Sequence, residues 1–122
     1  MKKNSLRLEE NLVYKKAMNL GILVWDVVHP WGYFQKDTIG KQWIRCTDSI
    51  AANIAEGYGR YHYKENRLFC FYGRGSLIES RTWLEKAFQR NLISQDEYFQ
   101  LKTELDLTGK ILNNYIKSIG PK

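Results

Sequence analysis

The sequence predicts an all-α protein, a single domain in which four helices form an antiparallel up-down-up-down bundle. Four long segments carry apolar residues at spacings of three and four, the period of a helix with one buried face. No segment shows the two-residue period of a strand flanked by hairpin turns. The connections are short, and 122 residues are enough for one hydrophobic core.

The first helix is expected over residues 11–28. Asn11 lies just before the periodic residues, where its short polar side chain can cap the first turn. Pro30 lies just after the helix, and its missing backbone donor is typical of a helix end. The apolar positions of this helix are Leu12, Ala17, Leu20, Val24 and Val27. The aromatic-rich connection that follows, about residues 29–36, is expected to pack back onto the bundle.

The second helix is expected over residues 37–56. Asp37 is a suitable N-cap, and Gly57 is expected at the position just after the last turn, where helices often end in glycine. The apolar positions follow steps of three and four along the segment: Ile39, Trp43, Cys46, Ile50 and Ile54. This pattern predicts one buried face.

The third helix, the longest, is expected over residues 64–90. The residues expected on its core face are Phe69, Tyr72, Ser76, Trp83 and Ala87. Gly73 and Gly75 interrupt the helix, and each costs about 1 kcal/mol relative to alanine. A close approach of another backbone would explain this cost. We therefore expect the third helix to cross the second closely, against the small residues Ala51, Ala52 and Ala55.

The fourth helix is expected over residues 94–119. It begins with a capping box, in which Ser94 is the N-cap and Glu97 is the third helical residue. Its apolar positions recur with the helical period along the whole segment: Tyr98, Leu101, Leu105, Ile111, Leu112, Tyr115 and Ile119. This helix would complete the bundle.

Charge and composition limit the class of partner. The chain has 19 Lys and Arg against 13 Asp and Glu, and the resulting net charge of +6 attracts polyanions such as nucleic acid. Cys46 and Cys70 are too few for a disulfide framework, so we expect buried thiols in a reducing compartment. The N-terminus lacks an apolar signal segment, and the longest apolar run, residues 21–28, is too short to cross a bilayer. We therefore expect a cytoplasmic protein without a membrane partner.

Residue patterns that carry enzyme chemistry are sparse, so no catalytic, cofactor-binding or metal-binding residue is predicted. Gly57 and Gly59 lack the third glycine of a dinucleotide fingerprint, and no strand is expected before them. His29 and His62 lie in different connections without Cys or Glu at zinc-ligand spacing. No helix carries the Glu-x-x-His pattern of a di-iron bundle. We expect a protein with no enzymatic activity and no small-molecule substrate.

Three arginines form a stripe on the third helix. Arg67, Arg74 and Arg81 are seven residues apart and therefore share one side of the helix. Phe71 and Ile78 lie beside them. Three interpretations are open: an ordinary solvated face, a subunit interface, or a ridge that contacts phosphates. The subunit interface is favoured, because arginine and aromatic residues are enriched at such surfaces.

Other basic residues are candidates for direct contact with nucleic acid. They lie on the first and second helices and at the corner that follows the second: Lys15, Lys16, Lys41, Arg45 and Arg60. Binding through such residues would depend on phosphate charge, so it would tolerate many sequences and weaken strongly with salt.

Two segments together resemble the signature of a known family. They are SIAANIAEGYGR at residues 49–60 and GSLIE at residues 75–79. This pair is similar to the signature of bacterial four-helix-bundle proteins first noticed in intervening sequences of 23S ribosomal RNA genes. A relative of this family is the accessory variability determinant of diversity-generating retroelements. The polar and glycine positions that match are Ser49, Asn53, Glu56, Gly57, Gly59, Arg60, Gly75, Ser76 and Glu79.

The resemblance implies an antiparallel four-helix bundle that assembles into a ring-shaped homopentamer and has no established enzymatic activity. For the retroelement relative it also implies a basic surface that binds nucleic acid and a partner reverse transcriptase. By this resemblance the chain is expected to bind RNA or DNA, as accessory to a reverse transcriptase or an RNA-processing partner. The alternative is a protein-interaction scaffold with no direct nucleic-acid binding. In that case the arginine stripe would serve the subunit interfaces.

Glu56 lies near the end of the second helix, where the negative end of the helix dipole disfavours a carboxylate. Because no base, metal or nucleophile accompanies it, we expect Glu56 to accept hydrogen bonds from backbone amides or from Arg60. Asn53, one turn earlier, is expected to join a polar network with Ser76 or Glu79 across the helix crossing. On this interpretation the motif is a structural corner.

Overall fold

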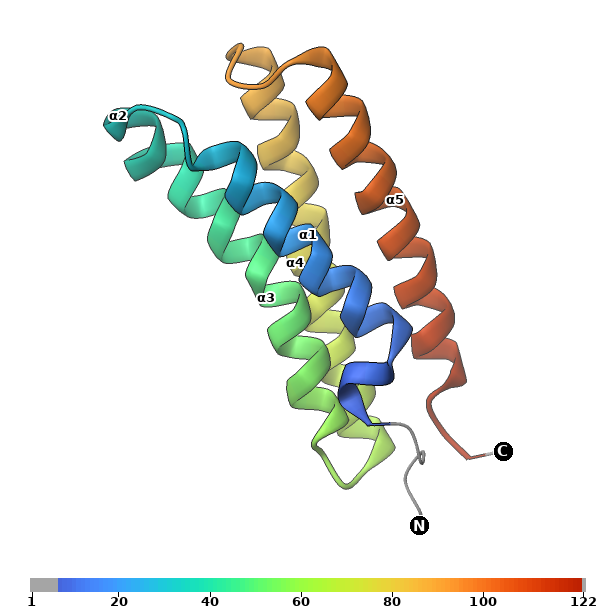
Figure 1. Cartoon of the computed structure of the whole chain (residues 1–122). Coiled ribbons are helices and arrows are strands. Elements are labelled where there is room, and N and C mark those ends of the chain that lie inside the picture. The colour runs from blue at the N-terminus through green and yellow to red at the C-terminus, as the bar shows by residue number, and fades with distance from the viewer. Residues whose placement is uncertain (1–6, 122) are drawn as a thin grey trace.

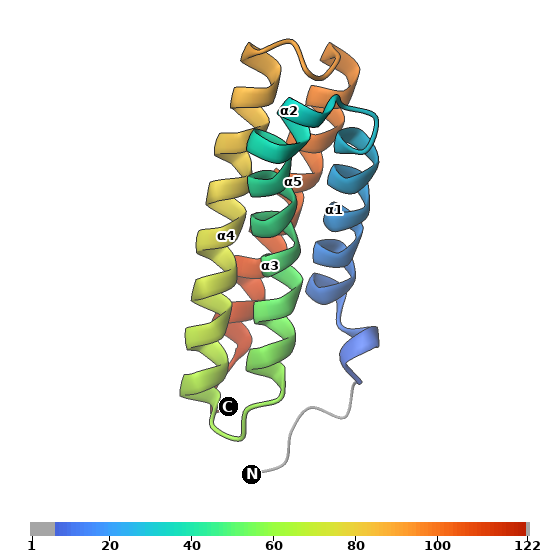
Figure 2. The same cartoon turned by 90° about the vertical axis from the view of Figure 1, so that its left-hand side faces the viewer.

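The computed structural model describes residues 7–121, and within them four long helices form a bundle (Figure 1). The long helices are α1 (Leu12–Val28), α3 (Lys41–Tyr58), α4 (Tyr63–Gln89) and α5 (Gln95–Ser118). A 3₁₀ turn, η1 (Leu8–Glu10), precedes α1. Successive long helices run in opposite directions (Figures 1 and 2), which confirms the predicted all-α up-down-up-down bundle. Around the bundle, α1 neighbours α3, α3 neighbours α4, α4 neighbours α5, and α5 neighbours α1.

The helix starts agree with two of the predicted caps. The Asn11 side chain accepts a hydrogen bond from the backbone N–H of Tyr14 at 3.0 Å. Ser94 and Glu97 form the predicted capping box, in which each side chain accepts from the other residue's backbone N–H. These caps satisfy amide donors that have no partner within the helix. The expected ranges of the first, third and fourth helices lie within one residue of α1, α4 and α5.

The prediction for the second helix was wrong at both ends. The chain turns helical earlier than Asp37, through α2 (Tyr33–Gln35) and a π-helical turn, η2 (Lys36–Gly40), and α3 follows without a break. Asp37 is therefore not an N-cap, and it pairs instead with Lys41 at 3.2 Å. Gly57 lies inside α3 and is buried against α4. A side chain would not fit there, because a Cβ would come within 2.8 Å of the Asn66 carbonyl oxygen. Gly59 is the residue that ends the helix.

The connection between α1 and α3 packs back onto the bundle only in part. The indole N–H of Trp31 donates to the carbonyl oxygen of Leu92 at 3.0 Å, which ties this connection to the α4–α5 loop. Both connections lie at the same end of the bundle (Figure 2). Tyr33 and Phe34 instead remain 80% and 72% exposed.

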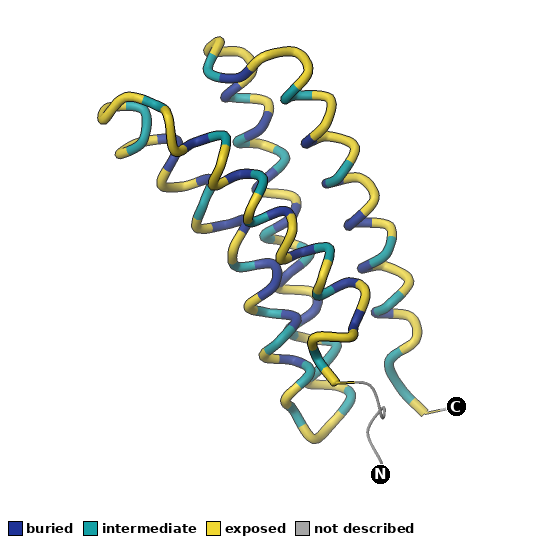
Figure 3. The backbone as a smooth tube through the Cα atoms, in the orientation of Figure 1, coloured by how far each residue is buried: buried dark blue, intermediate teal, exposed yellow. Residues whose placement is uncertain are grey.

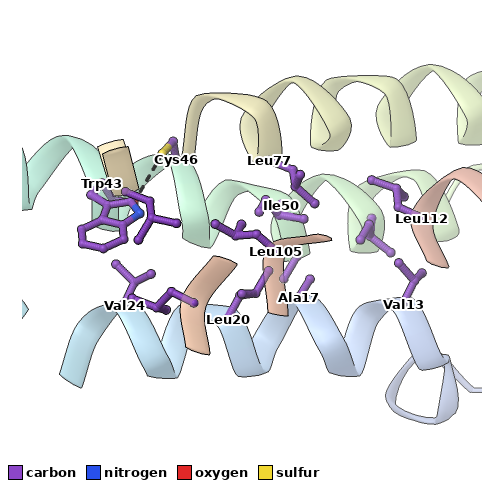
Figure 4. Packing of buried hydrophobic residues seen from close by; sticks show 14 of the residues in the cluster. Val13, Ala17, Leu20, Val24, Trp43, Cys46, Ile50, Leu77, Leu105 and Leu112 are labelled. Atoms are coloured by element: carbon purple, nitrogen blue, oxygen red, sulfur yellow. Dashed lines mark hydrogen bonds between the residues drawn. The ribbon is translucent and has the colours of Figure 1, made fainter. Parts of the chain in front are cut away.

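The hydrophobic core runs along the axis of the bundle, and all four long helices contribute buried residues to it (Figure 3). Aliphatic side chains such as Leu20, Ile50 and Leu105 fill its middle (Figure 4). A buried polar cluster joins α3 to α4: the Trp43 indole N–H donates to Ser80 Oγ at 3.0 Å, and Ser80 Oγ lies 2.7 Å from Thr47 Oγ1. These hydrogen bonds satisfy polar groups that burial would otherwise penalise.

The core face of α4 differs from the predicted one. Its buried residues are Cys70, Gly73, Leu77, Ser80, Leu84 and Ala87. Tyr72 is exposed, and Phe69, Ser76 and Trp83 are only half-buried, because they lie at the edges of that face. The prediction followed the large aromatic residues, whereas the close α3–α4 contact is made by smaller ones.

The predicted close crossing of α3 and α4 is present at Gly73 but not at Gly75. A Cβ on Gly73 would lie 3.3 Å from the carbonyl oxygen of Ile50, whereas a Cβ on Gly75 would meet no atom within 4 Å. The small residues of α3 do not face α4 either. Ala51, Ala52 and Ala55 line a surface between α3 and α1.

Candidate nucleic-acid interface

The corner after α3 holds the predicted ion pair. Arg60 donates to the Glu56 carboxylate at 2.7 Å, and its guanidinium carbon lies 4.8 Å from the centre of the Phe69 ring. A second carboxylate, that of Glu65, lies 3.8 Å from Arg60. Glu56 is about half exposed in this arrangement. The observed partner of Glu56 is therefore Arg60, as expected.

Asn53 takes part in a polar network that includes the predicted Ser76, which it reaches through Ser49 and not directly. Its side-chain amide donates to the carbonyl oxygen and to the hydroxyl of Ser49, both at 2.9 Å. The Ser49 hydroxyl in turn lies 3.0 Å from that of Ser76 on α4, so Ser49 is the bridge between the helices. Glu79 does not join this network and accepts instead from the Trp83 indole N–H.

The five residues expected to contact nucleic acid do not form one surface. Lys16 pairs with Glu104 of α5, at 3.9 Å, and Lys41 and Arg60 pair with acidic side chains of their own segment. Lys41 and Arg60 lie at opposite ends of α3, about 28 Å apart at 1.5 Å per residue. Lys15 and Arg45 are exposed, and neither forms an ion pair within residues 7–121.

The arginine stripe of α4 faces α5, and each of its three arginines contacts α5 or the residue that follows it. Arg67 donates to the carbonyl oxygen of Ile119 at 2.8 Å, and Arg74 donates to the side-chain oxygen of Asn113 at 3.1 Å. Arg81 pairs with Asp106 at 2.8 Å. Phe71 and Ile78, which lie beside the stripe, remain exposed, and the Arg74 guanidinium lies 4.7 Å from the centre of the Phe71 ring.

A groove between α4 and α5 gathers positive charge. Its lining is Arg74, Leu77, Ile78, Arg81, Gly109, Lys110, Asn113, Asn114 and Lys117. We call this the basic groove, because its lining holds four cationic side chains and no carboxylate. Arg81 is partly neutralised by Asp106, but Lys110 and Lys117 form no ion pair among the described residues. Such a groove offers cations and amide donors to phosphate oxygens.

Sequence reasoning missed the α5 half of this groove. Lys110 and Lys117 are seven residues apart, the same spacing as the arginines of α4, and Asn113 and Asn114 lie between them. This seven-residue repeat is visible in the sequence and could have identified the basic side of α5. It pointed to one side of α5, and only the packed helices show that this side meets the arginine stripe.

A second groove lies between α1 and α3. Its lining is Tyr14, Ala17, Met18, Gly21, Ile22, Trp25, Asp26, Asp48, Ala51, Ala52 and Ala55. We call this the acidic groove, because its charged residues are two aspartates and no cation lines it. Since α1 and α3 lie across the bundle from the α4–α5 pair, the two grooves are on opposite sides. Desolvation raises the pKa of Asp48, whose Oδ1 lies 2.7 Å from where a Cβ on Gly21 would be.

The described residues offer little to other kinds of chemistry. Cys46 and Cys70 are buried free thiols, as predicted, and burial raises their pKa to about 12 and about 11, which keeps them neutral and unreactive. Within residues 7–121, no cluster of three or more His, Cys, Asp or Glu side chains could hold a metal ion. No helix in this part of the chain has the length and apolar character needed to cross a membrane.

Comparison with known proteins agrees with the fold. The chain is similar to a crystal structure from Bacteroides thetaiotaomicron VPI-5482, described as a protein with unknown function from the S23 ribosomal protein family. The two share 22% identity and a TM-score of 0.82, over 88% of this chain and 97% of that one. No curated protein matches the sequence. The model of the 23S rRNA-intervening sequence protein family matches residues 9–114, so the chain belongs to this family.

Proposed function

We propose that the protein is a non-enzymatic, homo-oligomeric helical bundle that binds RNA or DNA through its basic groove. The observation that carries this proposal is the lining of the groove, where four cationic side chains and two asparagines converge without a carboxylate. The acidic groove lies on the opposite side of the bundle, and its negative charge would not attract nucleic acid.

The groove suits a phosphate backbone better than a particular base sequence. Lys110 and Lys117 can each approach a phosphate without breaking an ion pair, and Arg74 can add a third charged contact. Asn113 and Asn114 can donate to phosphate or sugar oxygens. Contacts of this kind position a nucleic acid and tolerate different sequences.

Self-assembly would strengthen such binding. The resemblance to the ring-forming family members supports a homopentamer, in which five copies of a +6 chain would carry about +30. Repeated grooves on one nucleic acid would give avidity from modest contacts in each subunit. In a cytoplasmic setting, the protein would then act as accessory to a reverse transcriptase or to an RNA-processing partner.

The second candidate function is a protein-interaction scaffold without direct nucleic-acid binding. It is favoured by Phe71 and Ile78, which are 42% and 58% exposed beside Arg74. Aromatic and arginine side chains together are typical of protein interfaces. On this alternative the cations of α4 serve contacts between subunits.

Fluorescence anisotropy with labelled mixed-sequence RNA and DNA distinguishes these functions. If the groove neutralises three phosphates of a duplex, raising the salt from about 50 to 200 mM should lower the affinity about 40-fold. The variant Lys110→Glu/Lys117→Glu should bind much more weakly at low salt. Its salt slope should also fall by about two, because two phosphate contacts are lost.

A second double variant, Lys41→Glu/Arg45→Glu, makes the same change of charge on α3 and is the matched control. It should retain most of the affinity if the basic groove is the site. Loss of binding only in this variant would place the site on α3. No binding by the wild-type protein at low salt would refute nucleic-acid binding and favour the scaffold.

A further inference from the structure

The outer side of α4 carries an apolar stripe that no other part of residues 7–121 covers. Leu68, Phe71, Gly75 and Ile78 follow steps of three and four, so they lie in one line along the helix. Leu68, Phe71 and Ile78 are 46%, 42% and 58% exposed. We call these four residues the outer stripe. Its length and spacing are those of a helix face that packs against another protein surface.

Gly75 in the middle of the outer stripe has no role within the bundle. A Cβ at this position would meet nothing within 4 Å, so neither the crossing with α3 nor a turn requires glycine there. A glycine inside a helix nevertheless costs about 1 kcal/mol relative to alanine. The cost is explained if another backbone approaches α4 from outside at this point.

The acidic groove offers apolar and small residues against which the outer stripe can pack. Met18, Ile22 and Trp25 form an apolar wall on α1, with 47%, 58% and 55% of their surface exposed. Facing them on α3 are the small residues Ala52 and Ala55, which leave room for an inserted helix face. The apolar wall and the two alanines together suit the outer stripe, which has large apolar side chains along its length and a glycine at its centre.

Charge complementarity selects which surface can fill the acidic groove. Asp26 and Asp48 form no ion pair or hydrogen bond among residues 7–121, and Asp48 is partly desolvated. Two acidic grooves placed face to face would repel each other. The outer stripe, by contrast, is flanked by Arg74, whose guanidinium already lies over the ring of Phe71.

We propose that the outer stripe of one copy seats in the acidic groove of the next copy. This proposal rests on the self-assembly in the proposed function and assigns the two surfaces that make it. The contact joins two different surfaces of the chain, the outer stripe and the acidic groove. Each copy carries both, so copies associate head to tail. The outer stripe shares Ile78 with the basic groove, and its flanking Arg74 also lines that groove. In the assembly Arg74 would face the acidic groove, whereas Lys110 and Lys117 lie on α5 and stay available for nucleic acid.

Two single variants separate the surfaces, with light scattering of the full-length protein as the readout. Ala52→Arg fills the acidic groove from an exposed position, and Gln100→Arg on the exposed side of α5 is its charge-matched control. Gly75→Gln places a side chain in the centre of the outer stripe, where the monomer has free space. We expect the wild type and Gln100→Arg to assemble, and Ala52→Arg and Gly75→Gln to be monomers.

Mixing the two variants tests whether the surfaces meet. Ala52→Arg keeps an intact outer stripe and Gly75→Gln keeps an intact groove, so an equimolar mixture should give particles of two chains and nothing larger. Circular dichroism and thermal melting show that each variant is folded. The melting temperature of Gly75→Gln should exceed that of a wild-type monomer, because a helix-forming residue replaces glycine.

Each outcome decides between the proposals. Variants that keep the wild-type mass, or folded variants whose mixture stays monomeric, would overturn the surface assignment and leave self-assembly standing. A wild-type protein that is monomeric at micromolar concentration would refute self-assembly, and the surface assignment with it. Nucleic-acid binding by the basic groove is measured separately, so it survives either result.

Discussion

Two glycines only two residues apart in α4 have opposite surroundings. Gly73 is buried in the α3–α4 crossing, where a Cβ would press on the carbonyl oxygen of Ile50 at 3.3 Å. Gly75 points to the outside, where a Cβ would meet nothing within 4 Å. The same residue type therefore has two physical explanations in one helix. The first is the packing of the chain itself, and the second, on the proposed assembly, is the surface that the chain presents to another copy.

The two sides of α4 therefore differ in what their residues stabilise. The inner side is held by short contacts and by the buried hydrogen bonds of Trp43, Thr47 and Ser80. The outer side keeps exposed apolar residues that an isolated monomer would not need. Changes on the inner side should therefore alter folding stability, and changes on the outer side should alter assembly.

The largest effect is expected for Gly73→Val. Its branched side chain cannot fit beside the Ile50 carbonyl without moving the α3 backbone, so the free energy of unfolding should fall by about 3 kcal/mol. Urea denaturation measures the change. Gly75→Val, measured with Gly73→Val at a protein concentration too low for assembly, is the matched control, since it makes the same substitution in free space. Equal losses of stability in the two variants would contradict the assigned difference between inner and outer side.

Ser80→Ala should have the next largest effect. It removes the shared partner of the Trp43 indole and the Thr47 hydroxyl, and leaving buried polar groups unsatisfied should cost about 2 kcal/mol. Ser118→Ala, at an exposed serine, controls for the loss of a hydroxyl group. A Ser80→Ala variant as stable as the wild type would show that the cluster contributes little to the α3–α4 contact.

Gly75→Ala should change stability in the opposite direction. At low concentration, where the protein is dissociated, its unfolding free energy should rise by about 1 kcal/mol because alanine favours the helix more than glycine does. Light scattering at higher concentration should show weaker assembly, since a methyl group then occupies the line of closest approach. If the variant were more stable and assembled as well as the wild type, the proposal that Gly75 allows another copy to approach closely would be contradicted.

The sequence predicted the bundle because its signals are local. The helical period of the apolar residues and the caps at Asn11 and Ser94 depend on neighbouring positions only, and both survived comparison with the structure. The start of the second helix was missed because Asp37 resembles a cap. The actual helical path begins after Gly32, through a π-helical turn that no local pattern marks.

The candidate site was less predictable, because it depends on how distant segments meet. The arginines of α4 form a stripe that the sequence shows, but Lys110 and Lys117 lie further along the chain, by 29 residues (Arg81 to Lys110) to 50 residues (Arg67 to Lys117). Only packing places them across a groove. Similarly, the sequence shows that Gly73 and Gly75 are unusual, but it does not show that they face opposite ways.

The smallest effect is expected for Glu56→Gln, at the exposed end of the α3–α4 pair. If Glu56 were a buried acceptor, its loss would cost about 1–3 kcal/mol in stability or assembly. The structure lowers this value, because Glu56 and Arg60 are 53% and 41% exposed and are spaced as an ordinary helical ion pair. Such pairs contribute about 0.3–0.5 kcal/mol.

Arg60 would also keep Glu65 and the Phe69 ring as neighbours after this substitution. Denaturant unfolding at low and high salt measures the change, and Glu104→Gln, which removes the half-buried partner of Lys16, is the comparison variant. A loss above 1 kcal/mol only in Glu56→Gln would mean that the carboxylate has a further contact in the assembled protein. The corner at residues 56–60 would then belong to the subunit interface as well as to the fold.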